Sequence, residues 1–315
     1  MTSSQSSSGS RGVLILAFVA LYIVWGSTYL AIRIAIETLP PFLMSGARFV
    51  LAGATLYAWG KLRGAPTISR GEWRGAAIVG AFLLLGGNGL VVWSEQRIPS
   101  GIAALLVGIT PFWMTLLDWL WLKSHRPTPG TIAGLLIGFA GLAILIGPQK
   151  LSAHDQPVDL VGAGTVLLAA LSWSVGSLYS RRLPKTASPI FNTGAQMIAG
   201  GTLLLIAGLA TGETSLLHPG AFSTRSLLAL GYLYAFGSLV GFSAYIYVLG
   251  HTTPARASTY AYVNPLVAVV LGWALAGEPL TTRTVVAAAL IIAAVVAITT
   301  LSVRQNAPVE TETVS

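Results

Sequence analysis

A few polar side chains lie within long apolar stretches of this sequence, and the chemistry they offer is hydrogen bonding. They are Asn88, Thr110, Gln196 and Asn264. An amide without a partner is costly in an apolar environment, so each amide must meet either a bound molecule or a neighbouring helix. We expect these side chains to line a cavity that binds a small substrate, with Tyr260 and Tyr262 as further contacts beside Asn264. Hydrogen bonds between helices are the alternative role for the amides.

Arg48 brings a positive charge into an apolar stretch, about 9 Å from its outer end at a rise of 1.5 Å per residue. We expect a structural role, in which the guanidinium reaches outward to Glu37 or Glu95. The alternative is that Arg48 binds the carboxylate of a substrate.

Asp118 is an acidic residue within another apolar stretch, about 6 Å from its inner end. A lone carboxyl inside a membrane is a candidate for proton coupling. Because this one lies near the end of its stretch, we expect it to reach the interface or to pair with Lys123 or Arg126, and proton coupling is the alternative.

The elements that position these side chains are membrane helices. The chain is 54% hydrophobic and only 9% charged, which is too apolar for a soluble protein. A bilayer core of about 30 Å is crossed by about 20 apolar residues in a helix. We predict an all-α integral membrane protein with ten transmembrane helices, near 13–36, 42–60, 75–94, 101–122, 130–147, 161–181, 190–210, 227–250, 255–276 and 284–303.

Basic residues are concentrated in the loops on one side of these predicted helices. The larger set is Arg11, Lys61, Arg63, Arg70, Arg74, Lys123, Arg126, Arg181, Arg182, Lys185, Arg256 and Arg304, and the smaller set is Arg97, Lys150, Arg225 and Arg283. Since cytoplasmic loops retain Lys and Arg, both termini are expected in the cytoplasm, as short disordered tails over 1–12 and 304–315. The same rule explains the net charge of +8 without nucleic-acid binding.

The sequence contains an internal repeat. A shift of 148 residues superposes Trp25 on Trp173, Arg33 on Arg181, Pro41 on Pro189, Gly46 on Gly194, Arg48 on Gln196 and Gly53 on Gly201. After six extra residues, a shift of 154 superposes Gly87 on Gly241, Pro111 on Pro265 and Trp119 on Trp273. Five helices per repeat is an odd number, so repeat 161–303 must be inverted relative to repeat 13–147. Inverted repeats are typical of secondary transporters, in which the substrate binds near the midplane.

The matched residues suggest parts of such a site. Trp25 and Trp173 fall in the middle of their helices, away from the interfaces where tryptophan usually lies, so we expect them to line the cavity. Packing in the core is the alternative. Pro111 and Pro265 lie about halfway along their helices and are candidates for a pair of hinges, with static kinks as the alternative.

Other features indicate a scaffold and argue against enzyme chemistry. Gly130, Gly134, Gly138 and Gly141 form a stripe of small residues that allows a close approach of helices, and this stripe is a candidate dimer face. The sequence has no cysteine, and its four histidines have no metal-ligand spacing. It also lacks a nucleotide-binding loop. We therefore expect no metal, no cofactor and no enzymatic activity.

Several short motifs together resemble EamA-type members of the drug/metabolite transporter superfamily. They are Trp25-Gly26-Ser27-Thr28-Tyr29, Pro40-Pro41, Ala47-Arg48-Phe49, Gly87-Asn88-Gly89, Ser100-Gly101-Ile102-Ala103-Ala104 and Tyr260-Ala261-Tyr262-Val263-Asn264-Pro265. The resemblance implies two inverted repeats of five helices, a bacterial inner-membrane location and the export of amino acids, aromatic or uncharged, or related metabolites. A broad drug or metabolite exporter, a sugar carrier and a channel are the alternatives, because the pattern indicates the class and not the cargo.

Overall fold

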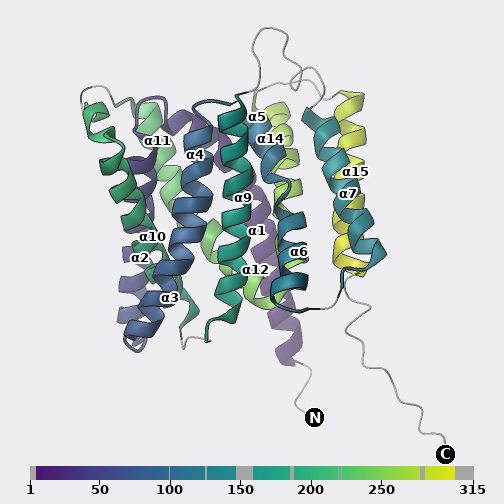
Figure 1. The fold of residues 1–315 in the computed structure, drawn as a ribbon, viewed down its shortest axis with the longest axis horizontal. Coiled ribbons are helices and arrows are strands. Elements are labelled where there is room, and N and C mark those ends of the chain that lie inside the picture. Colours follow the sequence, from purple (N-terminus) through teal and green to yellow (C-terminus); the bar gives the residue numbers. More distant parts are fainter. Residues whose placement is uncertain are drawn as a thin grey trace, which may run out of the picture.

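A computed structural model describes residues 5–98, 100–124, 126–146, 159–184, 188–218, 220, 222–276 and 281–301. All regular elements in this part of the chain are helices, and they stand side by side in one bundle (Figure 1). In chain order they are α1 (Gln5–Ala35), α2 (Pro41–Leu62), α3 (Arg70–Gly80), η1 (Ala81–Gly89), α4 (Leu90–Ser94), α5 (Ser100–Val107), α6 (Thr110–Trp121), α7 (Pro129–Ile146), α9 (Leu160–Arg182), α10 (Pro189–Ala210), η2 (Glu213–Leu216), α11 (Thr224–Tyr232), η4 (Leu233–Phe242), α12 (Ser243–His251), α13 (Pro254–Ala257), α14 (Tyr260–Ala276) and α15 (Thr282–Leu301).

Seven of the helical runs among the described residues are long and apolar enough to cross a membrane. They are Arg11–Ala35, Arg70–Ser94, Ile102–Trp121, Leu160–Arg182, Pro189–Ala210, Thr224–His251 and Thr282–Thr300, and Pro129–Leu145 is a shorter apolar helix. This agrees with an all-α membrane protein. Because α2, α7 and α14 fall outside this set of seven, the count of ten spans stays a prediction.

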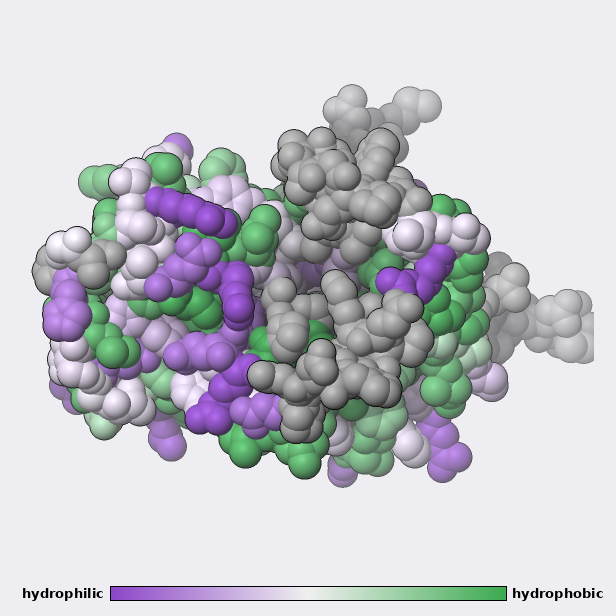
Figure 2. Space-filling model, turned by 90° about the horizontal axis from the view of Figure 1, so that it is seen from above, coloured by the Kyte–Doolittle hydropathy of each residue, from purple (hydrophilic) through white to green (hydrophobic). Residues whose placement is uncertain are grey.

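The surface of the bundle has the distribution of polarity that a bilayer requires. Large apolar side chains such as Leu16, Leu136 and Leu168 are exposed along the flanks. Hydrophilic side chains gather on one end of the bundle, which Figure 2 shows from above. Ion pairs lie at helix ends: Arg97 pairs with Asp159 at 3.2 Å, and Arg225, in the first turn of α11, pairs with Glu37 at 3.7 Å.

Glycines bring α2 and α10 into backbone contact. A Cβ atom built on Gly53 would lie 2.6 Å from the carbonyl oxygen of Gly194, and one built on Gly46 would lie 2.9 Å from that of Gly201. A side chain at any of these positions would force the helices apart. The small residues therefore set the distance between the two helices.

The glycine stripe of α7 is used within the chain. A Cβ atom on Gly134 would meet Ile298 of α15 at 2.8 Å, and one on Gly138 would meet the Tyr262 ring at 2.7 Å. Gly141 faces α15 in the same way. The interpretation of α7 and α15 as scaffold helices agrees with these contacts, whereas these three glycines are already covered and do not form a free dimer face.

Candidate functional site

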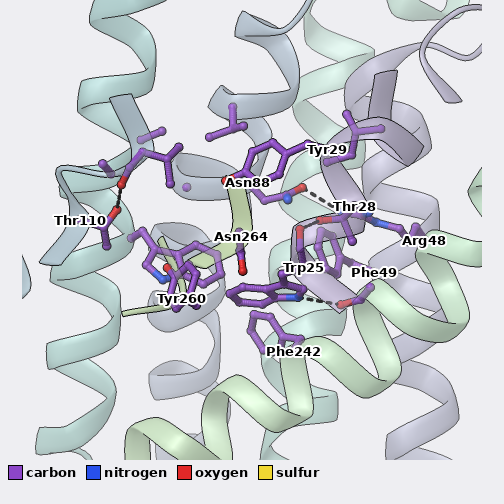
Figure 3. Close-up of a pocket in the computed structure, with 18 residues that line it drawn as sticks. Trp25, Thr28, Tyr29, Arg48, Phe49, Asn88, Thr110, Phe242, Tyr260 and Asn264 are labelled. Carbon is purple, nitrogen blue, oxygen red and sulfur yellow. Dashed lines mark hydrogen bonds between the residues drawn. The ribbon is translucent and has the colours of Figure 1, made fainter. Parts of the chain in front are cut away.

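A cavity lies in the middle of the bundle, and most of the residues expected there line it. The volume of the cavity that the centres of water molecules can occupy is about 100 Å³. The expected residues found in its wall are Trp25, Arg48, Asn88, Thr110, Trp173, Tyr260 and Asn264. Figure 3 shows Thr110 and Arg48 on opposite sides, with Asn88, Asn264 and Trp25 between them. The cavity therefore combines polar groups with aromatic rings.

Interrupted helices position these groups. Asn88 lies on η1, and Gly237 and Phe242 lie on η4; both are π-helical segments, which in helices are frequent at functional sites. The carbonyl of Gly237 accepts a hydrogen bond from Trp25 Nε1 at 3.2 Å. Thr110 is the first residue of α6, directly after a break between α5 and α6. The irregular backbone thus lies where it borders a cavity, as expected inside a membrane.

Pro111 and Pro265 both lie near an interruption of a helix, but at different distances from it. Pro111 is in the first turn of α6, just after the break at 108–109. Pro265 is inside α14, and the break between α13 and α14 precedes it by more than one turn. Their role as hinges stays a prediction, but the matched prolines do not occupy matched positions in their helices.

Four aromatic side chains close the cavity on one side. The Trp25 ring lies 5.4 Å from that of Trp173, 5.2 Å from that of Tyr245 and 5.0 Å from that of Tyr260, measured between centroids. Tyr245 is fully buried and accepts a hydrogen bond from Trp173 Nε1 at 2.9 Å. We call Trp25, Trp173, Tyr245 and Tyr260 the aromatic floor. Tyr245 was missed in the sequence, although it follows Gly241, the repeat partner of Gly87, by four residues.

The cavity lies entirely on one side of the aromatic floor. On α1 the cavity is lined only by Trp25 and later residues, and on α14 only by Tyr260 and later residues. On α9 it is lined only by Trp173 and earlier residues. It therefore extends toward the end of the bundle where α1 and α4 end and α9 begins. On the opposite side the hydroxyl groups of Tyr22 and Thr259 are hydrogen-bonded at 2.6 Å.

Arg48 is buried in the wall of the cavity, with only 3% of its surface exposed. Its Nη2 donates to Asn88 Oδ1 at 3.0 Å, and its guanidinium lies over the Phe49 ring at 4.3 Å from the centroid. Its Nε has no hydrogen-bond partner among the described residues. The expected pairing with Glu37 or Glu95 is wrong: Glu37 pairs with Arg225, and no ion pair of Arg48 occurs in the described part of the chain.

Asn264 offers an unused acceptor beside the aromatic floor. Its side chain is 1% exposed, and its Oδ1 has no hydrogen-bond partner among the described residues. The Thr110 hydroxyl, by contrast, donates to the Val107 carbonyl at 2.6 Å. The cavity therefore presents an uncompensated cation at Arg48 and a free acceptor at Asn264.

Two residues expected in the cavity, Tyr262 and Gln196, lie away from it, and Asp118 does not line it either. Tyr262 is buried against α7, and its hydroxyl donates to the Leu135 carbonyl at 3.1 Å. Gln196 is buried on α10 where that helix packs on α3 and η1. Asp118 is half-buried and accepts a hydrogen bond from Ser124 at 2.9 Å, in place of the expected contact with Lys123 or Arg126. Over the described ranges, no group of three or more acidic or histidine side chains could hold a metal ion.

The fold is that of a helical membrane protein with a central cavity, and comparison with known proteins identifies its family as one of transporters. The EamA-like transporter family matches residues 12–147 and 160–300, so the chain belongs to this family. This confirms the resemblance seen in the sequence.

Relatives of this chain are also named as transporters. The chain is 39% identical over 285 residues to the uncharacterized inner membrane transporter YedA of Escherichia coli K12, covering 90% of this chain and 89% of YedA. It is 27% identical to the uncharacterized transporter YvbV of Bacillus subtilis, covering 95% and 94% of the two chains. One crystal structure of another protein matches with a TM-score of 0.73 at 21% identity, over 93% of this chain and 99% of that chain, which shows a shared fold. These names indicate a transporter and not an enzyme.

Proposed function

We propose that this protein is an alternating-access carrier that exports small metabolites, foremost aromatic or uncharged amino acids, across a bacterial inner membrane. The observation that carries the proposal is the buried, uncompensated guanidinium of Arg48 in the wall of an aromatic cavity. A buried cation without a counterion favours an anionic ligand, and arginine matches the geometry of a carboxylate.

The remaining groups complement the rest of an amino acid. Asn264 Oδ1 is an acceptor for the substrate ammonium group. The aromatic floor offers ring faces and edges to an apolar or aromatic side chain. Carboxylate, ammonium and side chain thus each have a matching partner in one cavity.

We further propose that α2, α7 and α14 complete ten spans, arranged as two inverted repeats. If a two-fold axis relates two halves, every contact between them has a second copy formed by the equivalent residues. The contact of Gly46 with Gly201 has its counterpart in that of Gly194 with Gly53. The contacts of Gly87 with Trp173 and of Gly241 with Trp25 are related in the same way. The two segments matched by the EamA-like family agree with this division.

We also propose that both termini lie in the cytoplasm, which the distribution of basic residues supports. The aromatic floor then lies on the cytoplasmic side of the cavity, and the structure corresponds to a state that faces outward. Movement of the two repeats would open the floor and close the outer side.

A broad exporter of apolar drugs is the second candidate, because Phe49, Phe242 and Ile32 give much of the cavity wall an apolar character. An apolar drug would not use Arg48, so the two functions differ in their dependence on this residue. A sugar carrier would not need a buried cation, and a channel would not show counterflow.

Counterflow in proteoliposomes tests the proposal. Vesicles preloaded with unlabelled tryptophan, leucine or serine should take up labelled tryptophan with saturation. Arg48→Gln should lose most of this flux, whereas Gln196→Ala, at the repeat-related position outside the cavity, should keep it. Absence of amino-acid counterflow in protein that transports an apolar dye would favour the drug exporter.

A further inference from the structure

Glu95 is a buried carboxyl group without a hydrogen-bond partner. It follows the last residue of α4, and none of its surface is exposed. Neither Oε1 nor Oε2 has a hydrogen-bond partner among the described residues. Burial of an ionised carboxylate is costly unless it is paired, so this group favours its neutral, protonated form.

Charged and titratable neighbours compensate this carboxyl only in part, and none of them forms an ion pair or hydrogen bond with it among the described residues. On α1, Arg33 donates to the backbone carbonyl of Glu95 at 2.7 Å, and Tyr29 is near enough to interact electrostatically with the carboxyl group. On α2, Arg48 is bonded to Asn88. In the same turn as Glu95, Arg97 pairs with Asp159, which precedes α9. Helix α9 itself has no titratable side chain before Tyr179.

The fold does not require a carboxyl group at this position. The shift of 154 residues superposes Glu95 on Leu249, and Arg33 corresponds to Arg181 by the shift of 148. Arg181 donates to the backbone carbonyl of Leu249 at 2.6 Å, as Arg33 does to that of Glu95. The second repeat thus keeps the arginine–backbone hydrogen bond although the residue that accepts it, Leu249, is apolar. This hydrogen bond therefore does not depend on the carboxyl group of Glu95.

Glu95 lies next to the cavity, one helical turn beyond a residue that lines it. Asn88 and Val91 line the cavity from η1 and α4, and Glu95 follows Val91 by one helical turn. Tyr29 and Ile32 line the cavity from α1, and Tyr29 also interacts electrostatically with the carboxyl group of Glu95. A change in cavity shape would therefore change the surroundings of this acid.

Burial raises the pKa of Glu95 to about 8, and Arg33 opposes part of this effect. A group with this pKa binds and releases a proton near neutral pH.

We propose that Glu95 is the proton-binding residue that couples export to the proton gradient. The inference rests on the proposed carrier function. A proton from outside water binds the carboxylate while the cavity faces outward, and the neutral acid crosses the conformational change. The proton then passes to water that enters from the cytoplasm, and the regenerated carboxylate returns with the cavity loaded with substrate. One proton thus moves inward for each such return.

Infrared spectroscopy of the full-length protein in lipid tests proton binding without any substrate. Raising the pH from about 6 to 9.5 should remove a carbonyl-stretching band of a buried carboxylic acid. The band should be absent from Glu95→Gln and from Glu95→Leu, which copies the repeat partner Leu249 and suits a buried site. It should persist in Asp118→Asn. A titrating band that survives in both Glu95 variants would overturn the proposal.

Transport of labelled tryptophan tests the coupling. In wild-type proteoliposomes, a pH gradient should drive accumulation at least several-fold beyond equilibrium. In both Glu95 variants the internal concentration should fall back to the external one while counterflow continues, and Asp118→Asn should accumulate tryptophan as the wild type does. Counterflow in the wild type without any response to the pH gradient would refute coupling and leave the carrier function standing. Absence of counterflow in the wild type would instead refute the proposed cargo, and the infrared titration would still decide whether Glu95 binds a proton.

Discussion

At the scale of single residues, position 48 and its repeat partner 196 illustrate how two equivalent sites can differ. Arg48 faces the cavity and holds Asn88, whereas Gln196 is buried between α10 and its neighbours. The fold accepts a neutral side chain at this position in one repeat. The charge of Arg48 is therefore better explained by a ligand than by packing.

Replacing Arg48 with glutamine should raise the KM for tryptophan by about 10- to 100-fold, because a hydrogen bond to a charged group contributes about 1.5–3 kcal/mol. The amine analogue tryptamine, which lacks the carboxylate, should lose no affinity. Competition of each compound with labelled tryptophan measures the effect. Equal losses for both compounds would mean that Arg48 acts on the shape of the cavity and not on the carboxylate.

Glu95 should make the stability of the protein depend on pH. Its pKa, raised by burial to about 8, exceeds the ordinary value of about 4.5, so the folded state binds more protons between these values. The stabilisation is complete below the ordinary pKa and is lost as the pH rises through 8, by at most about 1.4 kcal/mol per pH unit. The melting temperature of the wild type should fall between pH 5 and 8. This fall should be much smaller in Glu95→Leu and unchanged in Glu37→Gln, which removes an exposed carboxyl.

Whether a residue predicted from the sequence lines the cavity depends on which face of its helix it occupies. Tyr260 and Asn264 are four residues apart and share one face of α14, whereas Tyr262 lies two residues from each and about 200° around the helix. Nearness in sequence to Asn264 was therefore a poor guide for Tyr262. Asn88, Val91 and Glu95 follow helical spacing, but Glu95 was considered only as a partner for Arg48.

At the scale of elements, backbone contact between α2 and α10 makes their glycines sensitive to the smallest side chain. Gly53→Ala should destabilise the protein by about 1–3 kcal/mol, because the new methyl group would lie 2.6 Å from the Gly194 carbonyl oxygen. Gly164→Ala is the matched control, since a Cβ atom there meets nothing within 4 Å. It should be neutral or stabilising by up to about 1 kcal/mol. Thermal unfolding in detergent measures both, and equal melting temperatures for the two variants would contradict the close packing.

The helix interruptions were only partly predictable. Proline at 111 and 265 indicated irregular backbone near the cavity, and both helices are indeed interrupted nearby. The π-helical turns η1 and η4 contain no proline, so no residue type announced them. Each of them contains a glycine that lies against the tryptophan of the other repeat, Gly87 in η1 and Gly241 in η4.

At the scale of the whole molecule, apolar runs and repeated tryptophans were sufficient to predict a helical membrane bundle with a central cavity. The side of the aromatic floor on which the cavity lies was not predictable. In the inverted repeat that we propose, Trp25 and Trp173 occupy equivalent positions. The sequence pattern that the two halves share is therefore the same whichever side of the cavity is open. Which side is open depends on how the two halves are packed, and that is a property of the conformation.

The orientation of the bundle can be measured because the chain has no cysteine of its own. Single cysteines at Glu37 and Arg63 lie beyond opposite ends of the first helical pair, since α1 ends before Glu37 and α2 ends before Arg63. A membrane-impermeant maleimide added to intact cells should label Glu37→Cys and leave Arg63→Cys unlabelled until the cells are opened. The reverse pattern would place both termini outside.

The same approach tests alternating access. Thr28 lines the cavity, whereas Phe18 lies beyond the floor, where its ring packs at 5.7 Å from that of Tyr22. With the floor closed, external maleimide should label Thr28→Cys and not Phe18→Cys. Excess cytoplasmic substrate should draw the carrier toward its inward state, so labelling of Thr28→Cys from outside should slow while labelling of Phe18→Cys from the cytoplasm becomes faster. A channel would open both positions together, and therefore a parallel rise at Thr28 and Phe18 from one side would exclude the carrier mechanism.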